Sequence, residues 1–165
     1  QPMLVTTVAI ALAGVASAAP APHLSWDHCF GDGQVANKTF ACSSNAGFET
    51  LILSYESPSA LTGIAGVEIV MHLAAVSSGY PAWWEVSGSG RCRTTALAPS
   101  FTGLPGSNCT DPYQGLAAGG VAALQIGVQS SGTAQLRLAV AVPPGAEWDV
   151  TPALEYFAMR LDVNH

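Results

Sequence analysis

The chain has 165 residues, of which 49% are hydrophobic and only 10% are charged, and its formal net charge is −6. This length fits one domain, and an apolar chain of low charge density is not typical of disorder. The acidic balance argues against a nucleic-acid binder, which needs a basic face, and against attachment to anionic lipids. The 17 glycines and 11 prolines argue against a helical bundle or coiled coil.

The N-terminal segment has the pattern of an export signal. Residues 3–15 are apolar or small and uncharged, and Ala16-Ser17-Ala18 follows before Pro20. An apolar run before an A-x-A site is typical of a secretory signal peptide, and it is short for a membrane span, which takes ~20 residues. We expect residues 1–18 to be a cleaved signal peptide. A retained membrane anchor and a buried core helix are the alternatives.

After residue 20, short runs of alternating apolar and polar residues predict strands. The clearest run places Leu136, Leu138 and Val140 on one face and Gln135 and Arg137 on the other. Turns rich in glycine, proline and serine separate the runs. The predicted strands are Thr50–Tyr55, Gly66–Leu73, Ala82–Ser87, Gly120–Gln129, Ala134–Val142 and Glu155–Asn164.

This pattern predicts an all-β fold, an antiparallel β-sandwich of the jelly-roll or Ig-like kind with about eight strands. Residues 19–165 are expected to form a single domain, and because the chain stops at a strand, we expect the natural protein to continue past His165. Gly115–Leu124 is alanine-rich, but its glycines favour a loop leading into a strand over a helix. Alternation places Val128 inward with Leu124, and Tyr156 outward.

The four cysteines are expected to form disulfides, because their number is even and the chain carries an export signal. Neither a C-x-x-C nor a zinc-like spacing is present. Four cysteines can be joined into two disulfides in three different ways. We favour Cys29–Cys42 and Cys92–Cys109, each closing a local loop, for which the chain-entropy model gives ~3 kcal/mol.

Five short motifs follow one another along the chain: Leu24-Ser25-Trp26 with Cys29, Thr39-Phe40-Ala41-Cys42, Gly90-Arg91-Cys92-Arg93, Cys109-Thr110-Asp111 and the strand that begins Glu155-Tyr156. In this order they resemble a group of secreted bacterial β-proteins to which no reaction is assigned. The resemblance covers residues 24–165. It implies export from a bacterium and an ordered β-domain, and it carries over no catalytic residue.

Motifs for catalysis are missing from the sequence: it has no G-x-S-x-G, H-E-x-x-H, P-loop or G-x-G-x-x-G. We therefore predict no enzyme, no catalytic residue, no metal and no cofactor. A calcium site near the cysteine loops at Asp27, Asp32 and Asp111 is an alternative, but ordinary turn-forming aspartates are the favoured explanation of these positions. The second alternative is a pair of carboxylates arranged as in a glycosidase. The candidates for this pair are Glu49, Glu56, Glu68, Glu85, Asp111, Glu147, Asp149 and Glu155.

The aromatic segment Tyr80-Pro81-Ala82-Trp83-Trp84 is the main functional lead. In a strand, adjacent tryptophans point to opposite faces, so Trp84 is expected in the core and Trp83 outside, beside Glu85. An exposed tryptophan near a carboxylate can stack on a sugar ring, which makes Tyr80, Trp83 and Glu85 candidate binding residues. The simpler interpretation is that loops cover Trp83. Trp26 and Trp148 are expected to be packing anchors.

Three functions remain. The first is a secreted, non-enzymatic module for structure or interaction at a bacterial cell surface or in the periplasm, with another surface protein as partner. The second is a glycan-binding module that takes a polysaccharide through Tyr80, Trp83 and Glu85. The third is a secreted hydrolase. Nucleic acid is not expected as a partner, and the membrane is expected to matter only before the signal peptide is cleaved.

Overall fold

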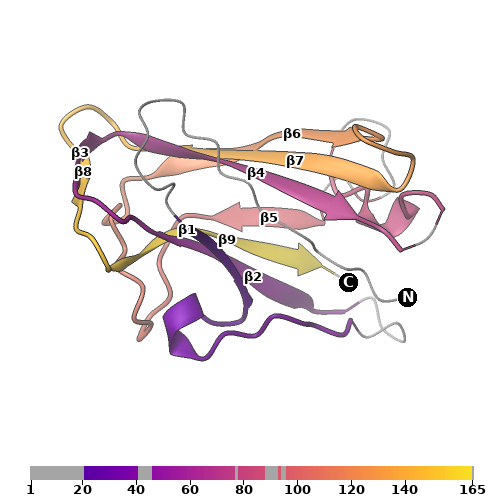
Figure 1. Ribbon diagram of the computed structural model, residues 1–165, viewed down its shortest axis with the longest axis horizontal. Coiled ribbons are helices and arrows are strands. Elements are labelled where there is room, and N and C mark those ends of the chain that lie inside the picture. Colours follow the sequence, from indigo (N-terminus) through magenta and orange to yellow (C-terminus); the bar gives the residue numbers. More distant parts are fainter. Residues whose placement is uncertain (1–20, 41–45, 77, 88–92, 94–95, 165) are drawn as a thin grey trace.

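Two packed antiparallel sheets form the structure, a computed structural model that describes residues 21–40, 46–76, 78–87, 93 and 96–164. One sheet has the strand order β1-β2-β9-β5 and the other β4-β7-β6, while the short pair β3-β8 lies at one end of the sandwich (Figure 1). The expected all-β sandwich is confirmed. The strands are β1 Ala21–Trp26, β2 Phe48–Glu56, β3 Leu61–Ile64, β4 Gly66–Ala74, β5 Leu97–Ser100, β6 Ala118–Ile126, β7 Thr133–Ala141, β8 Trp148–Val150 and β9 Glu155–Asn164.

The core lies between the two sheets and is built by the predicted alternation. On β7, Leu136, Leu138 and Val140 are buried while Arg137 is exposed. β4 pairs with β7 along its whole length and contributes the buried side chains expected of it. The predicted anchors Trp26 and Trp148 are also buried, and the Trp148 indole donates a hydrogen bond to the Tyr55 hydroxyl at 3.1 Å. The alternation in the sequence therefore correctly predicts the faces of the central strands.

Four short strands had no clear signal in the sequence: β1, β3, β5 and β8. β1 contains Pro22 and β5 contains Pro99, and proline disfavours a strand prediction because it cannot donate to a sheet. β1 and β5 are the two edge strands of the sheet with the order β1-β2-β9-β5. An edge strand has one side without hydrogen bonds to a neighbour, which is where proline is tolerated.

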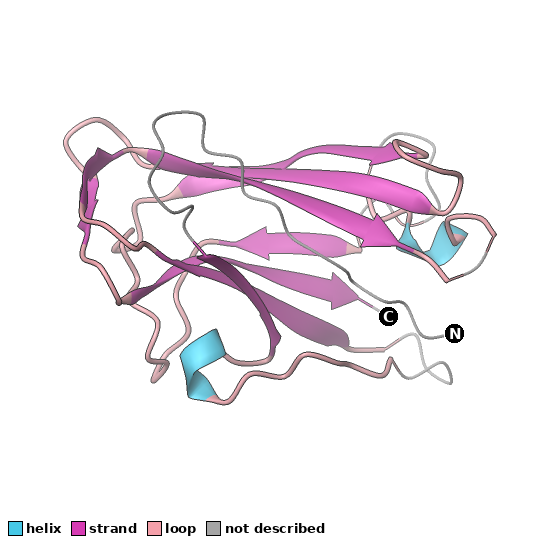
Figure 2. Ribbon diagram, viewed as in Figure 1, coloured by secondary structure: helices cyan, strands magenta, loops and turns pink. Residues whose placement is uncertain are grey.

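The predicted strand Ala82–Ser87 is wrong. Ala82–Trp84 forms a 3₁₀ turn, η2, and a second turn, η1, covers Phe30–Asp32 at the other end of the molecule (Figure 2). The Trp84 amide donates to the Pro81 carbonyl at 2.9 Å and the Glu85 amide to the Ala82 carbonyl at 3.1 Å. These local bonds turn the backbone back on itself, so the opposite-face rule for adjacent residues in a strand does not apply to Trp83 and Trp84.

The side chains of Tyr156 and Val128 do not face the side of the sheet that the sequence predicts for them. Tyr156 is buried rather than outward, because the pairing of β2 with β9 shifts between Leu53 and Ser54 and skips Ala158. A bulge of this kind reverses the alternation beyond it. Val128 is 45% exposed rather than inward, because β6 ends at Ile126 and Gly127, with φ 78°, turns the chain away. The predicted passage from loop to strand before β6 is confirmed.

Two arginines lie on the long strands β7 and β9, which belong to different sheets. The Arg137 guanidinium donates to the Glu68 carboxylate at 3.0 Å on the exposed face of β4 and β7. Arg160 lies 3.2 Å from the Asp162 carboxylate on its own strand. Each arginine therefore has its own carboxylate partner, which is ordinary surface electrostatics.

Neighbouring glycines on β6 provide a matched stability test. A Cβ at Gly119 would lie 2.1 Å from the Ala139 carbonyl oxygen, whereas a Cβ at Gly120 would meet nothing within 4 Å. We expect Gly119→Ala to lower the free energy of unfolding by about 1–3 kcal/mol, the usual range for overpacking. Gly120→Ala is the control. Equal stability of the two variants in urea unfolding would show that β6 does not approach β7 this closely.

Buried tyrosines are expected to make the fold sensitive to alkali. Burial raises the pKa of Tyr55 to about 12 and also raises the pKa values of Tyr80 and Tyr113. A tyrosine whose pKa is higher in the folded chain than in the unfolded chain stabilises the fold. Its contribution to the free energy of unfolding is fully present below the unfolded pKa of about 10, and it is lost as the pH rises towards 12. Tyrosinate absorbance should therefore develop together with unfolding. Full ionisation of a still-folded chain near pH 10 would contradict this.

Candidate functional site

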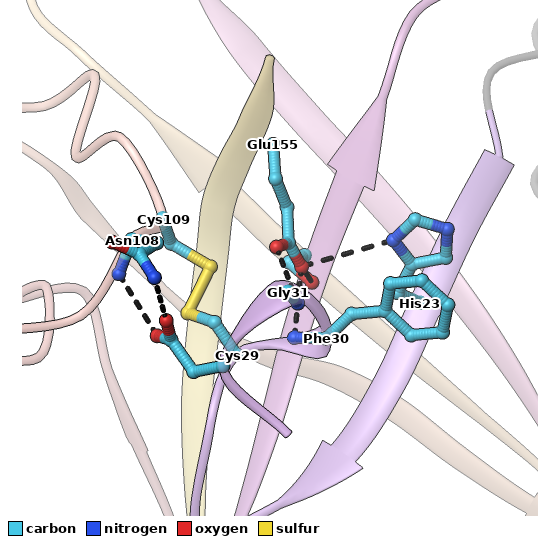
Figure 3. The surroundings of a disulfide bond; sticks show 9 residues. His23, Cys29, Phe30, Gly31, Asn108, Cys109 and Glu155 are labelled. Carbon is cyan, nitrogen blue, oxygen red and sulfur yellow. Dashed lines mark hydrogen bonds and ion pairs between the residues drawn. A yellow bond between two sulfur atoms is a disulfide. The ribbon is translucent and has the colours of Figure 1, made fainter. Parts of the chain in front are cut away.

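A disulfide joins Cys29 to Cys109, with 6.0 Å between their Cα atoms (Figure 3). The favoured local pairs Cys29–Cys42 and Cys92–Cys109 are therefore wrong. Of the three possible connectivities, the one that contains Cys29–Cys109 leaves Cys42 and Cys92 as the other pair. Cys42 and Cys92 themselves lie outside the described residues.

Both partners of this disulfide lie beside the start of β9. The Thr110 amide donates to the Glu155 carbonyl at 2.8 Å, and the Phe157 amide donates to the Thr110 carbonyl at 2.9 Å. On the other side, η1 follows Cys29 directly, and its Phe30 amide donates to the Glu155 carboxylate. β9 therefore brings together two cysteines that are 80 residues apart in the sequence, and loop length alone could not predict this.

Glu155 is the most strongly anchored carboxylate of this region. It is 8% exposed, and its oxygens accept hydrogen bonds from the Phe30 and Gly31 amides, both at 2.9 Å, and from the Ser54 hydroxyl at 2.5 Å. The His23 ring stacks on Phe30 with 3.8 Å between centroids, and its Nδ1 lies 3.7 Å from Glu155 Oε1. Figure 3 shows Glu155, Phe30 and His23 gathered beside the disulfide.

Sequence reasoning missed this cluster. Glu155 is one of eight carboxylate candidates, but neither His23 nor Ser54 is a candidate, and the structure places these two residues directly opposite each other on β1 and β2. Buried serines and histidines have no pattern that separates them from surface ones, so only the strand register reveals their proximity.

The geometry of the cluster is that of a structural anchor. The Ser54 hydroxyl donates to the Glu155 carboxylate, but both residues are buried, at 3% and 8% exposed, and two backbone amides also hold the carboxylate in place. A neighbouring pocket lined by Pro22, His23 and Val67, among others, leaves about 10 Å³ for the centre of a water molecule. That is room for about one water and not for a sugar ring.

The predicted binding residues lie in an aromatic cluster at the η2 end of the sandwich. Trp83 contacts Phe40 and Trp84 edge to face, with centroids 5.4 and 4.9 Å apart. The Arg93 guanidinium carbon lies 3.8 Å from the centroid of the Trp83 ring, and Arg93 also donates to the Trp83 carbonyl at 3.1 Å. Arg93 thus occupies one face of the indole that a sugar would need, an arrangement typical of a cation–π packing contact.

Tyr80 and Glu85 flank this tryptophan. The Tyr80 hydroxyl donates to the Trp84 carbonyl at 3.3 Å, and burial, with the nearby Glu85 carboxylate as a second cause, raises the Tyr80 pKa. Tyr80 and Trp83 are therefore half-buried and already in contact with the protein. The glycan-binding role of Tyr80, Trp83 and Glu85 stays a prediction, to be tested by polysaccharide binding with Trp83→Ala alongside.

The aspartates considered for calcium lie in separate networks. Asp27 accepts from Lys38 at 2.6 Å, Asp32 accepts from the Asn108 amide at 2.8 Å, and Asp111 accepts from the Tyr113 amide at 2.9 Å. No three His, Cys, Asp or Glu side chains within the described ranges come together as metal ligands. These contacts fit the turn-forming role that aspartate commonly has.

The outer edge of β6 is one of the two edges of the sheet β4-β7-β6, and it is the less covered of the two. β6 pairs with β7 on one side, and no backbone hydrogen bond from another described residue reaches its other side. Its inward-facing Val121, Leu124 and Ile126 remain half-buried, whereas the corresponding residues of the opposite edge strand β4 are 2–4% exposed. β6 also carries no charged side chain. A long, uncharged edge strand of this kind is a template for another strand.

Comparisons with known proteins give no family for this chain. No family model matches it, and neither the curated proteins nor the solved structures include a significant match. None of the helices among the described residues has the length and apolar character needed to cross a bilayer.

Proposed function

We propose that this chain is an exported, non-enzymatic β-sandwich module that binds another chain at the bacterial cell surface through the outer edge of β6. The observation that carries this proposal is the combination of an edge to which no described residue donates or accepts a further backbone hydrogen bond and an inward apolar row that stays half-buried. An added strand would satisfy the backbone groups of the edge and cover that row, which is how β-augmentation works.

Two further features support the proposal. A buried disulfide between distant segments is typical of proteins that fold in oxidising compartments. The buried Ser54 and Glu155 share a hydrogen bond and the half-buried His23 stacks on Phe30, so this cluster is better suited to holding η1 on the sheet than to turnover.

Retention on cells tests the interaction. The purified chain, labelled and added to washed source cells, is expected to bind saturably. Gln125→Lys on β6 should weaken that binding, because a lysine on an edge strand discourages strand addition. Gln135→Lys is the matched control, since Gln135 pairs directly with Gln125 but lies on the central strand β7. No saturable binding, or equal loss in both variants, would overturn the proposal.

The cellular location of the chain tests whether it is exported. The chain is expected in the medium or the cell envelope with its cysteines oxidised. Recovery in the cytoplasm with free thiols would overturn the exported part of the proposal.

A further inference from the structure

We propose that the strand that pairs with β6 is β6 of a second copy of this chain. This inference rests on the proposed function and names its partner. The two copies would pair antiparallel, edge to edge, about a two-fold axis perpendicular to the sheet. The three-stranded sheets of the two molecules would then join into one continuous sheet.

The register of β6 defines which residues take part. The pairing with β7 shifts at Ala122, between Val121 and Ala123, and this leaves Ala123–Ile126 as a regular segment. Leu124 pairs with buried Leu136 and therefore faces the core, while Gln125 pairs with Gln135 and faces outward. An added strand here covers apolar surface as well as backbone.

The segment is complementary to itself. A two-fold axis perpendicular to a sheet keeps inward faces on the same side, so Leu124 and Ile126 of one copy would lie next to the same row of the other. The outward Gln125 amides can both donate and accept hydrogen bonds. Because β6 has no charged residue, self-pairing places no like charges opposite each other, which would destabilise the pair.

The other edge of the same sheet explains why the assembly would stop at two copies. On β4 the inward Ile69, Met71 and Leu73 are fully buried, and the outward Glu68 pairs with Arg137. A β6–β6 contact is isologous, so both copies use the same edge and no β6 edge is left over. The remaining β4 edges carry the charged Glu68, which discourages strand addition, so a dimer is expected and not a fibre.

Charge reversal at one position tests the inference. We expect sedimentation velocity to show a dimer for the wild-type chain, and Gln125→Lys and Gln125→Glu to weaken dimerisation by about tenfold or more when each is studied alone. An equimolar mixture of the two variants should form the dimer again, because Lys and Glu would then face each other. Gln135→Lys should remain a dimer, since this side chain lies one strand away from the edge.

Each outcome is decisive. Restored dimerisation in the mixture supports the inference, and a variant that had only misfolded could not produce it. A monomeric wild-type chain, or a mixture that stays monomeric while both variants are folded by circular dichroism, overturns it. A monomer that still binds cells through β6 leaves the proposed function standing with a different partner. A β6-dependent dimer without cell binding leaves this inference standing and removes the proposed function.

Discussion

Replacing Cys29 and Cys109 together with alanine is expected to lower the free energy of unfolding by about 4.5 kcal/mol. The chain-entropy model gives this value for the 80-residue separation of the two cysteines, against ~3 kcal/mol for the local pairs that the sequence favoured. Both side chains are buried, so the variant also loses packing. Urea unfolding of the oxidised wild-type chain and the variant measures the difference.

Peptide mapping under non-reducing conditions is the companion measurement. We expect a proteolytic fragment in which the peptide with Cys29 is joined to the peptide with Cys109. If Cys42 and Cys92 are joined to each other, the unfolded chain should contain no free thiol. A fragment that links Cys29 to Cys42 would show that the pairing drawn from the structure is incorrect. An unchanged stability of the double variant would mean that the crosslink does not restrict the unfolded chain.

Glu155→Ala is expected to lower the free energy of unfolding by about 3–5 kcal/mol. Its carboxylate accepts from the Phe30 and Gly31 amides and from the Ser54 hydroxyl, and each buried donor left without an acceptor costs roughly 1–3 kcal/mol. For a domain of this size the melting temperature should fall by ~10 °C. Differential scanning calorimetry is the direct measurement.

Two variants make this result specific. Glu155→Gln keeps the size of the side chain but replaces one acceptor oxygen with a donor, so its stability should lie between those of the wild type and Glu155→Ala. Glu147→Ala is the control, because Glu147 lies on the surface and its carboxylate accepts from the Gly145 amide in an exposed turn, where substitutions usually change stability by less than about 0.5 kcal/mol. Equal effects of Glu155→Ala and Glu147→Ala would refute the anchoring role.

The sequence predicted best where a strand stays regular. β7 alternates without interruption, and the inward and outward residues expected of it are confirmed. The expectation for Tyr156 was wrong because the bulge near Ala158 changes the alternation, and a bulge depends on how two strands match each other. The expectation for Ala82–Ser87 was wrong because six residues can satisfy a period of two by chance, while Pro81 and local hydrogen bonds favour a turn.

The candidate site was less accessible from the sequence. Tyr80, Trp83 and Glu85 are close to one another because they are close in the chain, but the Arg93 guanidinium on the Trp83 ring belongs to a different segment. Likewise, His23, Ser54 and Glu155 come from three strands, and their proximity depends on the pairing of β1 with β2 and of β2 with β9. No pattern within one segment contains this information.

The sequence by itself determined the all-β class and the faces of the regular strands, because a period of two follows from the geometry of a single extended chain. Only the tertiary structure decided which cysteines meet, which glutamate is buried and which strand keeps an open edge. These features depend on contacts between distant residues, such as Phe30 and Glu155, which are 125 positions apart, and such contacts are selected by the packing of the whole core.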